Sequence, residues 1–351
     1  MTALYTPALP VSPRPKPIPV TIIGGFLGAG KTTLLNHILS ENHGLRAAVL
    51  VNDFGAINID AKLVVGVEDD TINLANGCIC CNIRDDLIGA CLGLLQRPQP
   101  PDYLIIETSG VSNPLQIATT FLMPELQQIL ALDSILCVVD CEQFPSLSGE
   151  SADLVRVQIA AADILILNKT DLVDSAGLAQ VRSMIRSISP QSQLIEAKHG
   201  RVPISLILGV GSNEQSDKNL IVSSHHSDHG EHSHFSSWSW TCDRPLSLLK
   251  LRSFFELLPE TIYRAKGVLN LEKLSEYEVI LQKVGKRSSL NNGSRWGTQT
   301  PRTEIVMIGI EGSIDEDAMR VALERCIYDK NEKMTPLMNR MRELTSTTDK
   351  F

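Results

Sequence analysis

The sequence has no long apolar run and no surplus of basic residues. Its 351 residues include 40 Asp or Glu and 32 Lys or Arg, which give a formal net charge of −8. A general nucleic-acid binder usually carries a basic surplus instead. No apolar run approaches the ~18 residues that a membrane-spanning helix requires. We therefore expect neither nucleic acid nor a membrane among the partners of this chain.

The chain also lacks the apolar core of a signal peptide and the cysteine pairs of a disulfide framework. Its first 19 residues contain six prolines, which indicate a disordered leader rather than a secretion signal. Three of the eight cysteines lie within four positions, a pattern that favours metal binding by reduced thiols. These features predict a cytoplasmic protein.

The stretch from Val20 to Leu39 combines a short buried strand, a glycine-rich turn and an apolar-periodic helix. Within it, the spacing G-x-x-x-x-G-K-T is that of a phosphate-binding P-loop, in which backbone N–H groups and the helix N-terminus face one anion. Lys31 is expected to reach the β and γ phosphates, and the Thr32 hydroxyl to bind Mg²⁺. The predicted phosphate-binding residues are Gly25, Gly28, Gly30, Lys31, Thr32 and Thr33.

Continuous apolar strands alternate with helical segments through the first part of the chain, as in a parallel sheet covered on both faces. The predicted fold class is α/β: a P-loop nucleotide domain with a mostly parallel sheet, followed by a smaller α+β domain with helices on one face of an antiparallel sheet. The expected organisation is a leader at 1–17, the P-loop nucleotide domain at 18–208, a linker at 209–237, an α+β domain at 238–334 and a polar tail at 335–351.

An acidic residue ends the apolar strand that begins at Tyr103, in the sequence E-T-S-G. We expect Glu107 to hold Mg²⁺ or its water and the Gly110 backbone to contact the γ phosphate. With Lys31 and Thr32, Glu107 completes the predicted catalytic set. The alternative is a carboxylate that only caps the following helix.

The sequence N-K-T-D follows another apolar strand, at Ile164 to Leu167. A guanine presents donors to a carboxylate and acceptors to an amide, roles that Asp171 and Asn168 can fill. Lys169 can lay its stem against the base. These three residues favour GTP over ATP, and we expect that preference to be lost in Asp171→Asn.

A C-x-C-C cluster lies between the nucleotide motifs. The thiolates of Cys78, Cys80 and Cys81 suit Zn²⁺, Co²⁺, Ni²⁺ or Cu⁺, and three sulfurs leave a fourth coordination position open. Packing cysteines or a redox sensor are the alternatives. The other five cysteines fall in helical or strand patterns and are predicted to pack in the core: Cys91, Cys137, Cys141, Cys242 and Cys326.

Five of the eight histidines fall within ten residues of the predicted linker. Imidazoles at this density bind first-row divalent metals, which predicts an auxiliary metal site; a solvated polar tether is the alternative. The histidines are His225, His226, His229, His232 and His234. We expect His37, His43 and His199 to be structural or surface residues.

Taken together, the motifs G-G-F-L-G-A-G-K-T-T, N-D-F-G, N-G-C-I-C-C, E-T-S-G and N-K-T-D resemble, in order, those of the CobW family of P-loop GTPases. The segments L-P-E-T-I-Y-R-A-K-G-V-L and T-E-I-V-M-I-G resemble the second domain of that family. The resemblance implies a GTP-hydrolysing metallochaperone that binds Mg²⁺ and a transition metal, Zn²⁺ or Co²⁺. It also places Asp53 where the family commonly has Glu, so a metal-binding role for this shorter carboxylate is an open alternative.

The resulting hypothesis is that GTP and Mg²⁺ order the segment carrying Asp53 and the C-x-C-C cluster, and that hydrolysis releases the metal to a client protein. Reciprocal coupling is required, since GTP and metal must raise each other's affinity equally. The expected partners are GTP or GDP and a metal-requiring client, with a second copy of the chain as an option. The rivals are a metal buffer or sensor with a structural nucleotide, and an ATP-dependent kinase or synthetase.

Overall fold

A computed structural model of the chain describes residues 17–41, 43–51, 71–73, 83–208 and 235–329. The chain divides into two compact units, residues 1–231 and 232–351, and each is described by itself. No helix in the described ranges is both long enough and apolar enough to cross a membrane.

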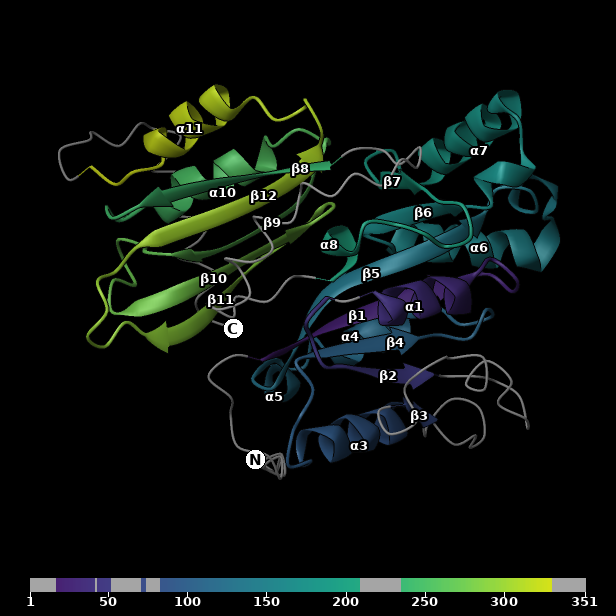
Figure 1. Cartoon of the computed structure of the whole chain (residues 1–351), viewed down its shortest axis with the longest axis horizontal. Coiled ribbons are helices and arrows are strands. Elements are labelled where there is room, and N and C mark those ends of the chain that lie inside the picture. Colours follow the sequence, from purple (N-terminus) through teal and green to yellow (C-terminus); the bar gives the residue numbers. More distant parts are fainter. Residues whose placement is uncertain (1–16, 42, 52–70, 74–82, 209–234, 330–351) are drawn as a thin grey trace, which may run out of the picture. The chain divides into compact units, whose positions relative to one another are not determined.

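The first unit is built on a sheet in which every described strand pair is parallel (Figure 1). Its strand order is β3-β2-β4-β1-β5-β6-β7. The strands are β1 (Ile18–Gly25), β2 (Ala47–Val51), β3 (Thr71–Asn73), β4 (Tyr103–Glu107), β5 (Leu130–Asp140), β6 (Ile164–Asn168) and β7 (Gln193–Glu196). The central strands β1, β4 and β6 are mostly apolar and are buried along nearly their whole length, which confirms the predicted parallel sheet.

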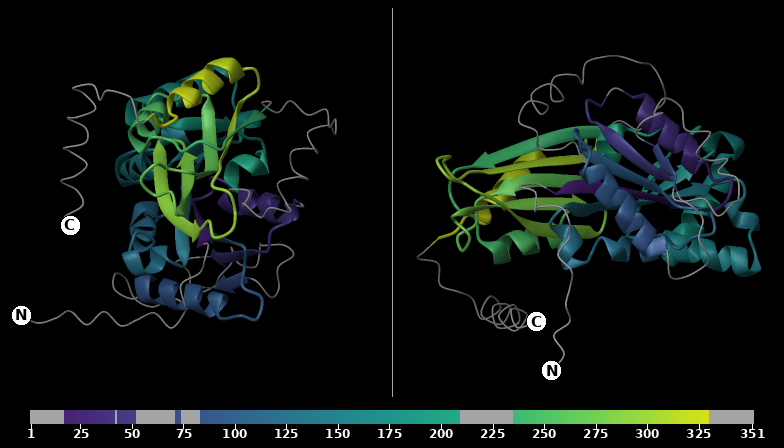
Figure 2. Two further views of the ribbon diagram at one scale, coloured as in Figure 1. Left: turned by 90° about the vertical axis from the view of Figure 1, so that its left-hand side faces the viewer. Right: turned by 90° about the horizontal axis from the view of Figure 1, so that it is seen from below.

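Helices cover both faces of this sheet (Figure 2). Side chains of α3, α4 and α5 share one core with β1, β2 and β4, and those of α6 and α7 pack against β5 and β6. Figure 1 shows α1 and α4 on opposite faces. The helices are α1 (Lys31–Ser40), α3 (Ile83–Leu95), α4 (Pro114–Thr120), α5 (Pro124–Gln127), α6 (Gly149–Ala161), α7 (Ser175–Ile188) and α8 (Ile204–Ile207), with 3₁₀ turns η1 (Phe144–Ser146) and η2 (Thr170–Leu172).

Local capping explains where two of these helices begin. Asn113 accepts a hydrogen bond from the Leu115 N–H at 3.0 Å, and Pro114 occupies the first position of α4, where no N–H partner is needed. Asp174 caps α7 in the same way, accepting from the Gly177 N–H at 2.8 Å. Both caps use short polar side chains directly before the helix.

The second unit is an antiparallel sheet of order β11-β10-β9-β12-β8. Its strands are β8 (Phe235–Cys242), β9 (Ile262–Leu269), β10 (Tyr277–Val284), β11 (Arg287–Arg295) and β12 (Thr303–Ile310). The helices α10 (Leu248–Glu256) and α11 (Glu316–Arg325) pack their apolar residues into one core with this sheet. The expected α+β architecture is therefore confirmed. Strand β11 was not predicted, because its sequence R-S-S-L-N-N-G-S-R is polar.

Candidate functional site

The glycine-rich turn joins β1 to α1 at the carboxyl end of the sheet. Gly25 ends β1, Gly28 lies in the turn with a φ of 74°, and Gly30 precedes α1 with a φ of 103°. A Cβ at Gly30 would lie 2.3 Å from Asn168 Nδ2. Because Gly30 combines left-handed backbone with this close approach, only glycine fits there.

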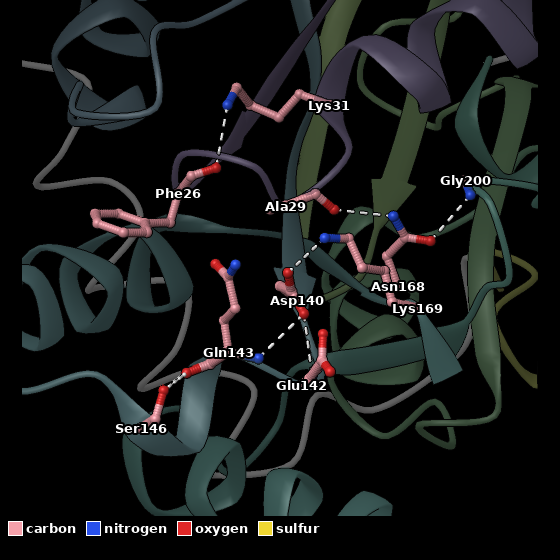
Figure 3. A network of polar contacts seen from close by, with 10 residues as sticks. All are labelled: Phe26, Ala29, Lys31, Asp140, Glu142, Gln143, Ser146, Asn168, Lys169 and Gly200. Atoms are coloured by element: carbon pink, nitrogen blue, oxygen red, sulfur yellow. Dashed lines mark hydrogen bonds and ion pairs between the residues drawn. The ribbon is translucent and has the colours of Figure 1, made fainter. Parts of the chain in front are cut away.

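The first turn of α1 presents the predicted lysine and hydroxyl groups. The Lys31 side chain is mostly buried, and its Nζ donates to the Phe26 carbonyl at 3.2 Å (Figure 3). Thr32 is half-buried and Thr33 is exposed. The ammonium group of Lys31 thus lies over the same loop whose N–H groups form the predicted phosphate cradle.

Glu107 meets the first turn of α1 because β1 and β4 are neighbours. Their register places Ile23 opposite Glu107, and the Thr32 hydroxyl donates to Glu107 Oε1 at 2.8 Å. Glu107 is 2% exposed. The alternative role for this carboxylate, capping the following helix, is wrong, since Asn113 caps α4. A hydroxyl and a carboxylate are the hard oxygen ligands that Mg²⁺ takes from proteins, so this pair fits the ion.

Asn168, at the end of β6, joins three loops. Its Nδ2 donates to the Ala29 carbonyl at 2.9 Å, and its Oδ1 accepts from the Gly200 N–H at 2.9 Å (Figure 3). The side chain is 2% exposed. Asn168 therefore ties the glycine-rich turn to the loop that follows β7.

Lys169 is held by a residue that sequence reasoning missed. Its backbone has a φ of 60°, and its Nζ lies 2.7 Å from Asp140 Oδ2 at the end of β5 (Figure 3). The other oxygen of Asp140 accepts from the N–H groups of Glu142 and Gln143. The signal was present in the sequence, because Asp140, like Glu107, is a carboxylate that ends an apolar strand.

Asp171 and the loop after β7 form the outer edge of this region. Asp171 lies in η2 and faces solvent, with Oδ2 4.0 Å from His199 Nε2. The Ala197 carbonyl accepts from both the N–H and the hydroxyl of Thr170. His199 is exposed, as expected for a surface residue. The sequence analysis missed this loop, because β7 has only four residues and no continuous apolar run.

Gly110 lies in the turn between β4 and α4. A Cβ at this position would lie 2.7 Å from both the backbone nitrogen and the Cδ2 atom of Leu27. The turn that carries Gly110 therefore packs directly on the glycine-rich turn.

The predicted transition-metal ligands lie outside the described residues. These are Asp53, Cys78, Cys80, Cys81 and the linker histidines His225, His226, His229, His232 and His234. Within the described ranges, no group of three or more His, Cys, Asp or Glu residues could hold a metal ion.

The remaining cysteines test the core prediction. Cys91, Cys137, Cys141 and Cys326 are buried, as predicted, whereas Cys242 is only half-buried. Burial raises the pKa of Cys137 to about 12 and that of Cys326 to about 11. These thiols stay protonated near neutral pH and do not supply thiolate ligands.

A glycine-rich turn between a buried strand and a helix, with Lys31 over it and Glu107 at the neighbouring strand end, defines a P-loop nucleotide-binding protein. Residues 19–196 match the model of the CobW/HypB/UreG nucleotide-binding domain family, and residues 235–327 match the cobalamin synthesis protein cobW C-terminal domain family. The chain belongs to the CobW family of P-loop GTPases.

Two named relatives and one solved structure are similar to all or part of this chain. A protein named zinc chaperone CobW from Sinorhizobium sp is 34% identical and covers 87% of this chain and 96% of its own length. Zinc-regulated GTPase metalloprotein activator 1 from Dictyostelium discoideum is 37% identical over 55% of this chain and 48% of its own length. The crystal structure of Zn(II)-bound YjiA GTPase from E. coli is 24% identical, covers 89% of this chain and all of that chain, and gives a TM-score of 0.41.

Proposed function

We propose that this protein is a GTP-hydrolysing zinc chaperone, which binds its metal at the C-x-C-C cluster and transfers it to a client protein in a nucleotide-dependent way. The observation that carries the nucleotide half of the proposal is the meeting of Lys31, the Thr32–Glu107 pair and Asn168 at one edge of the sheet. The zinc half rests on the thiol cluster in the sequence and on the zinc chaperones to which the chain is similar.

In this proposal the glycine-rich turn binds the phosphates of GTP. Lys31 leaves the Phe26 carbonyl and donates to the β and γ phosphates, and Gly25, Gly28, Gly30 and Thr33 line the cradle. Thr32 and Glu107 would hold Mg²⁺, and the bound ion would neutralise charge that develops on the phosphates. Glu107 orients the Thr32 oxygen through their hydrogen bond, and Gly110 meets the γ phosphate.

The guanine would be read by the loop after β6. The Asn168 amide nitrogen has two hydrogens, and its bond to Ala29 uses one, so the second can donate to an acceptor on the base. Asp171, which faces solvent, can accept from the N1 and N2 donors of guanine. The stem of Lys169, anchored by Asp140, would lie along the base.

Zinc is the cargo in this scheme, with cobalt as a competing cargo. The thiolates of Cys78, Cys80 and Cys81 supply three soft ligands, and the open fourth position allows the metal to leave. Asp53 is a further ligand in the proposal, and the linker histidines form an auxiliary site of modest affinity. The essential requirement is that metal affinity differs between the GTP and GDP states, by a coupling of about 1–3 kcal/mol.

An anaerobic zinc titration against a competing chelator tests this requirement. The titration is run on the full chain with a non-hydrolysable GTP analogue, with GDP and without nucleotide, each in the presence of Mg²⁺. We expect roughly 5- to 150-fold tighter zinc binding with the analogue. Cys80→Ser should abolish this difference, whereas Cys242→Ser, at a half-buried cysteine of the second unit, should preserve it. Equal zinc affinity in all three states would instead indicate a metal buffer with a structural nucleotide.

A further inference from the structure

A buried amide on α6 contacts the turn that carries Gly110. Gln158 is 0% exposed, and its Nε2 lies 3.2 Å from the Gly110 carbonyl and 2.9 Å from the Ser112 carbonyl. Its Oε1 has no hydrogen-bond partner in the part of the chain that the structure describes. None of the nucleotide motifs includes Gln158.

The chemistry of these contacts fixes the orientation of the amide. Both neighbours are carbonyl oxygens, which can only accept, so the nitrogen of Gln158 must face them and uses both of its hydrogens there. Leaving a buried amide oxygen without a donor is unfavourable. An apolar side chain of the same size would avoid that cost but would orphan two carbonyls of the Gly110 turn. The two donated bonds are therefore the specific contribution of Gln158.

The turn held by Gln158 is in contact with the phosphate loop. A Cβ at Gly110 would lie 2.7 Å from the Leu27 nitrogen and 2.9 Å from its Cα. The turn is closed by a hydrogen bond from the Ser112 N–H to the Ser109 carbonyl at 3.0 Å. A displacement of this turn would therefore alter its packing on Leu27, which lies in the glycine-rich turn between β1 and α1.

We infer that Gln158 is a positioning residue for nucleotide hydrolysis: by holding the Gly110 and Ser112 carbonyls, it aims the Gly110 turn at the γ phosphate. The inference rests on the proposed function, since it takes Gly110 as the contact to that phosphate. Gln158 touches neither nucleotide nor metal in this scheme and acts through the turn. Helix α6, through Gln158 and the Gly110 turn, then contributes to the discrimination between GTP and GDP.

Gln158→Leu removes both bonds without adding charge and tests the inference in the full chain. We expect kcat for GTP to fall about tenfold, as for the loss of two buried hydrogen bonds. Binding of a non-hydrolysable GTP analogue should weaken by a similar factor. GDP affinity should stay within about twofold of wild type, because GDP lacks the phosphate that the turn meets. Gln158→Glu directs a carboxyl group at two carbonyl oxygens, so its kcat for GTP should fall further than that of the leucine variant.

Ile159→Val is the matched control, because Ile159 is equally buried on the same helix but packs in the apolar core. It should change thermal stability without changing the ratio of analogue to GDP affinity. Equal weakening of both nucleotides in Gln158→Leu, or wild-type kinetics, would overturn the inference. If the leucine variant does not fold, Gln158→Met, with an unbranched side chain of similar length, carries the same comparison. A wild-type chain that hydrolyses no GTP would refute the proposed function instead.

Discussion

Asn168→Ala is expected to destabilise the first unit even without nucleotide. The substitution removes two hydrogen bonds of 2.9 Å and leaves the Ala29 carbonyl and the Gly200 N–H without this partner. Both groups belong to buried residues, and each orphaned buried group costs about 1–3 kcal/mol. Allowing for partial relaxation, we expect a loss of about 3 kcal/mol in the free energy of unfolding.

Circular dichroism of the nucleotide-free protein during urea unfolding measures this loss. The three tryptophans of the chain, Trp238, Trp240 and Trp296, all lie in the second unit. Their fluorescence therefore follows the unfolding of that unit and provides an internal reference. The Asn168→Ala variant should lower the midpoint of the first-unit transition by circular dichroism more than it lowers the tryptophan midpoint.

Asp171→Asn is the matched control from the same loop. Asp171 faces solvent, and its Oδ2 lies 4.0 Å from His199 Nε2, so its replacement should change the free energy of unfolding by less than about 0.5 kcal/mol. It should nevertheless abolish the preference for GTP over ATP. Equal urea midpoints for the alanine and asparagine variants would refute the tethering role of Asn168. Unchanged GTP selectivity in Asp171→Asn would refute its role in base recognition.

Three further predictions follow from single contacts. Gly30→Ala should lower the free energy of unfolding, measured by thermal unfolding, by about 2 kcal/mol, because alanine is strained in the left-handed backbone conformation and its Cβ would clash with Asn168. Gly28→Ala should show a smaller loss, because its Cβ would meet no atom within 4 Å. Asp140→Asn should lower the free energy of unfolding by about 1–2 kcal/mol, also measured by thermal unfolding, because Lys169 loses its carboxylate partner. The same substitution should weaken GTP binding measured by calorimetry. Unchanged GTP affinity would contradict the role of Asp140 in anchoring Lys169. Burial raises the pKa of Cys137 from 9.0 to about 12, so the unfolded chain ionises this thiol first, and stability should fall as pH rises from about 9 towards about 12. Urea midpoints measured across that pH range should fall less steeply in Cys137→Val than in the wild-type chain. Equal slopes in the two chains would contradict the raised pKa of Cys137.

Much of the nucleotide site could be predicted from the sequence because its parts are local. The residues from Gly25 to Thr32 are contiguous: they run from the end of β1 through the glycine-rich turn to the first residues of α1, and their spacing reflects the geometry of one bound anion. Continuous apolar runs predicted the central strands because a strand buried on both faces has no polar side to alternate with. Helix α7 and strand β7 were missed, because α7 is half polar and β7 is short.

The sequence by itself determined the P-loop, the strand-end carboxylate Glu107 and the alternation of strands and helices, since each depends on neighbours along the chain. Only the tertiary structure decided that Asn168 would hold Ala29, 139 positions away, and that Gln158 would hold the Gly110 turn. Such contacts depend on which strands lie side by side and on how the helices pack over them. Hydrophobic periodicity shows that a segment is buried, but the strand order β4-β1-β5-β6 determines which other segments it contacts.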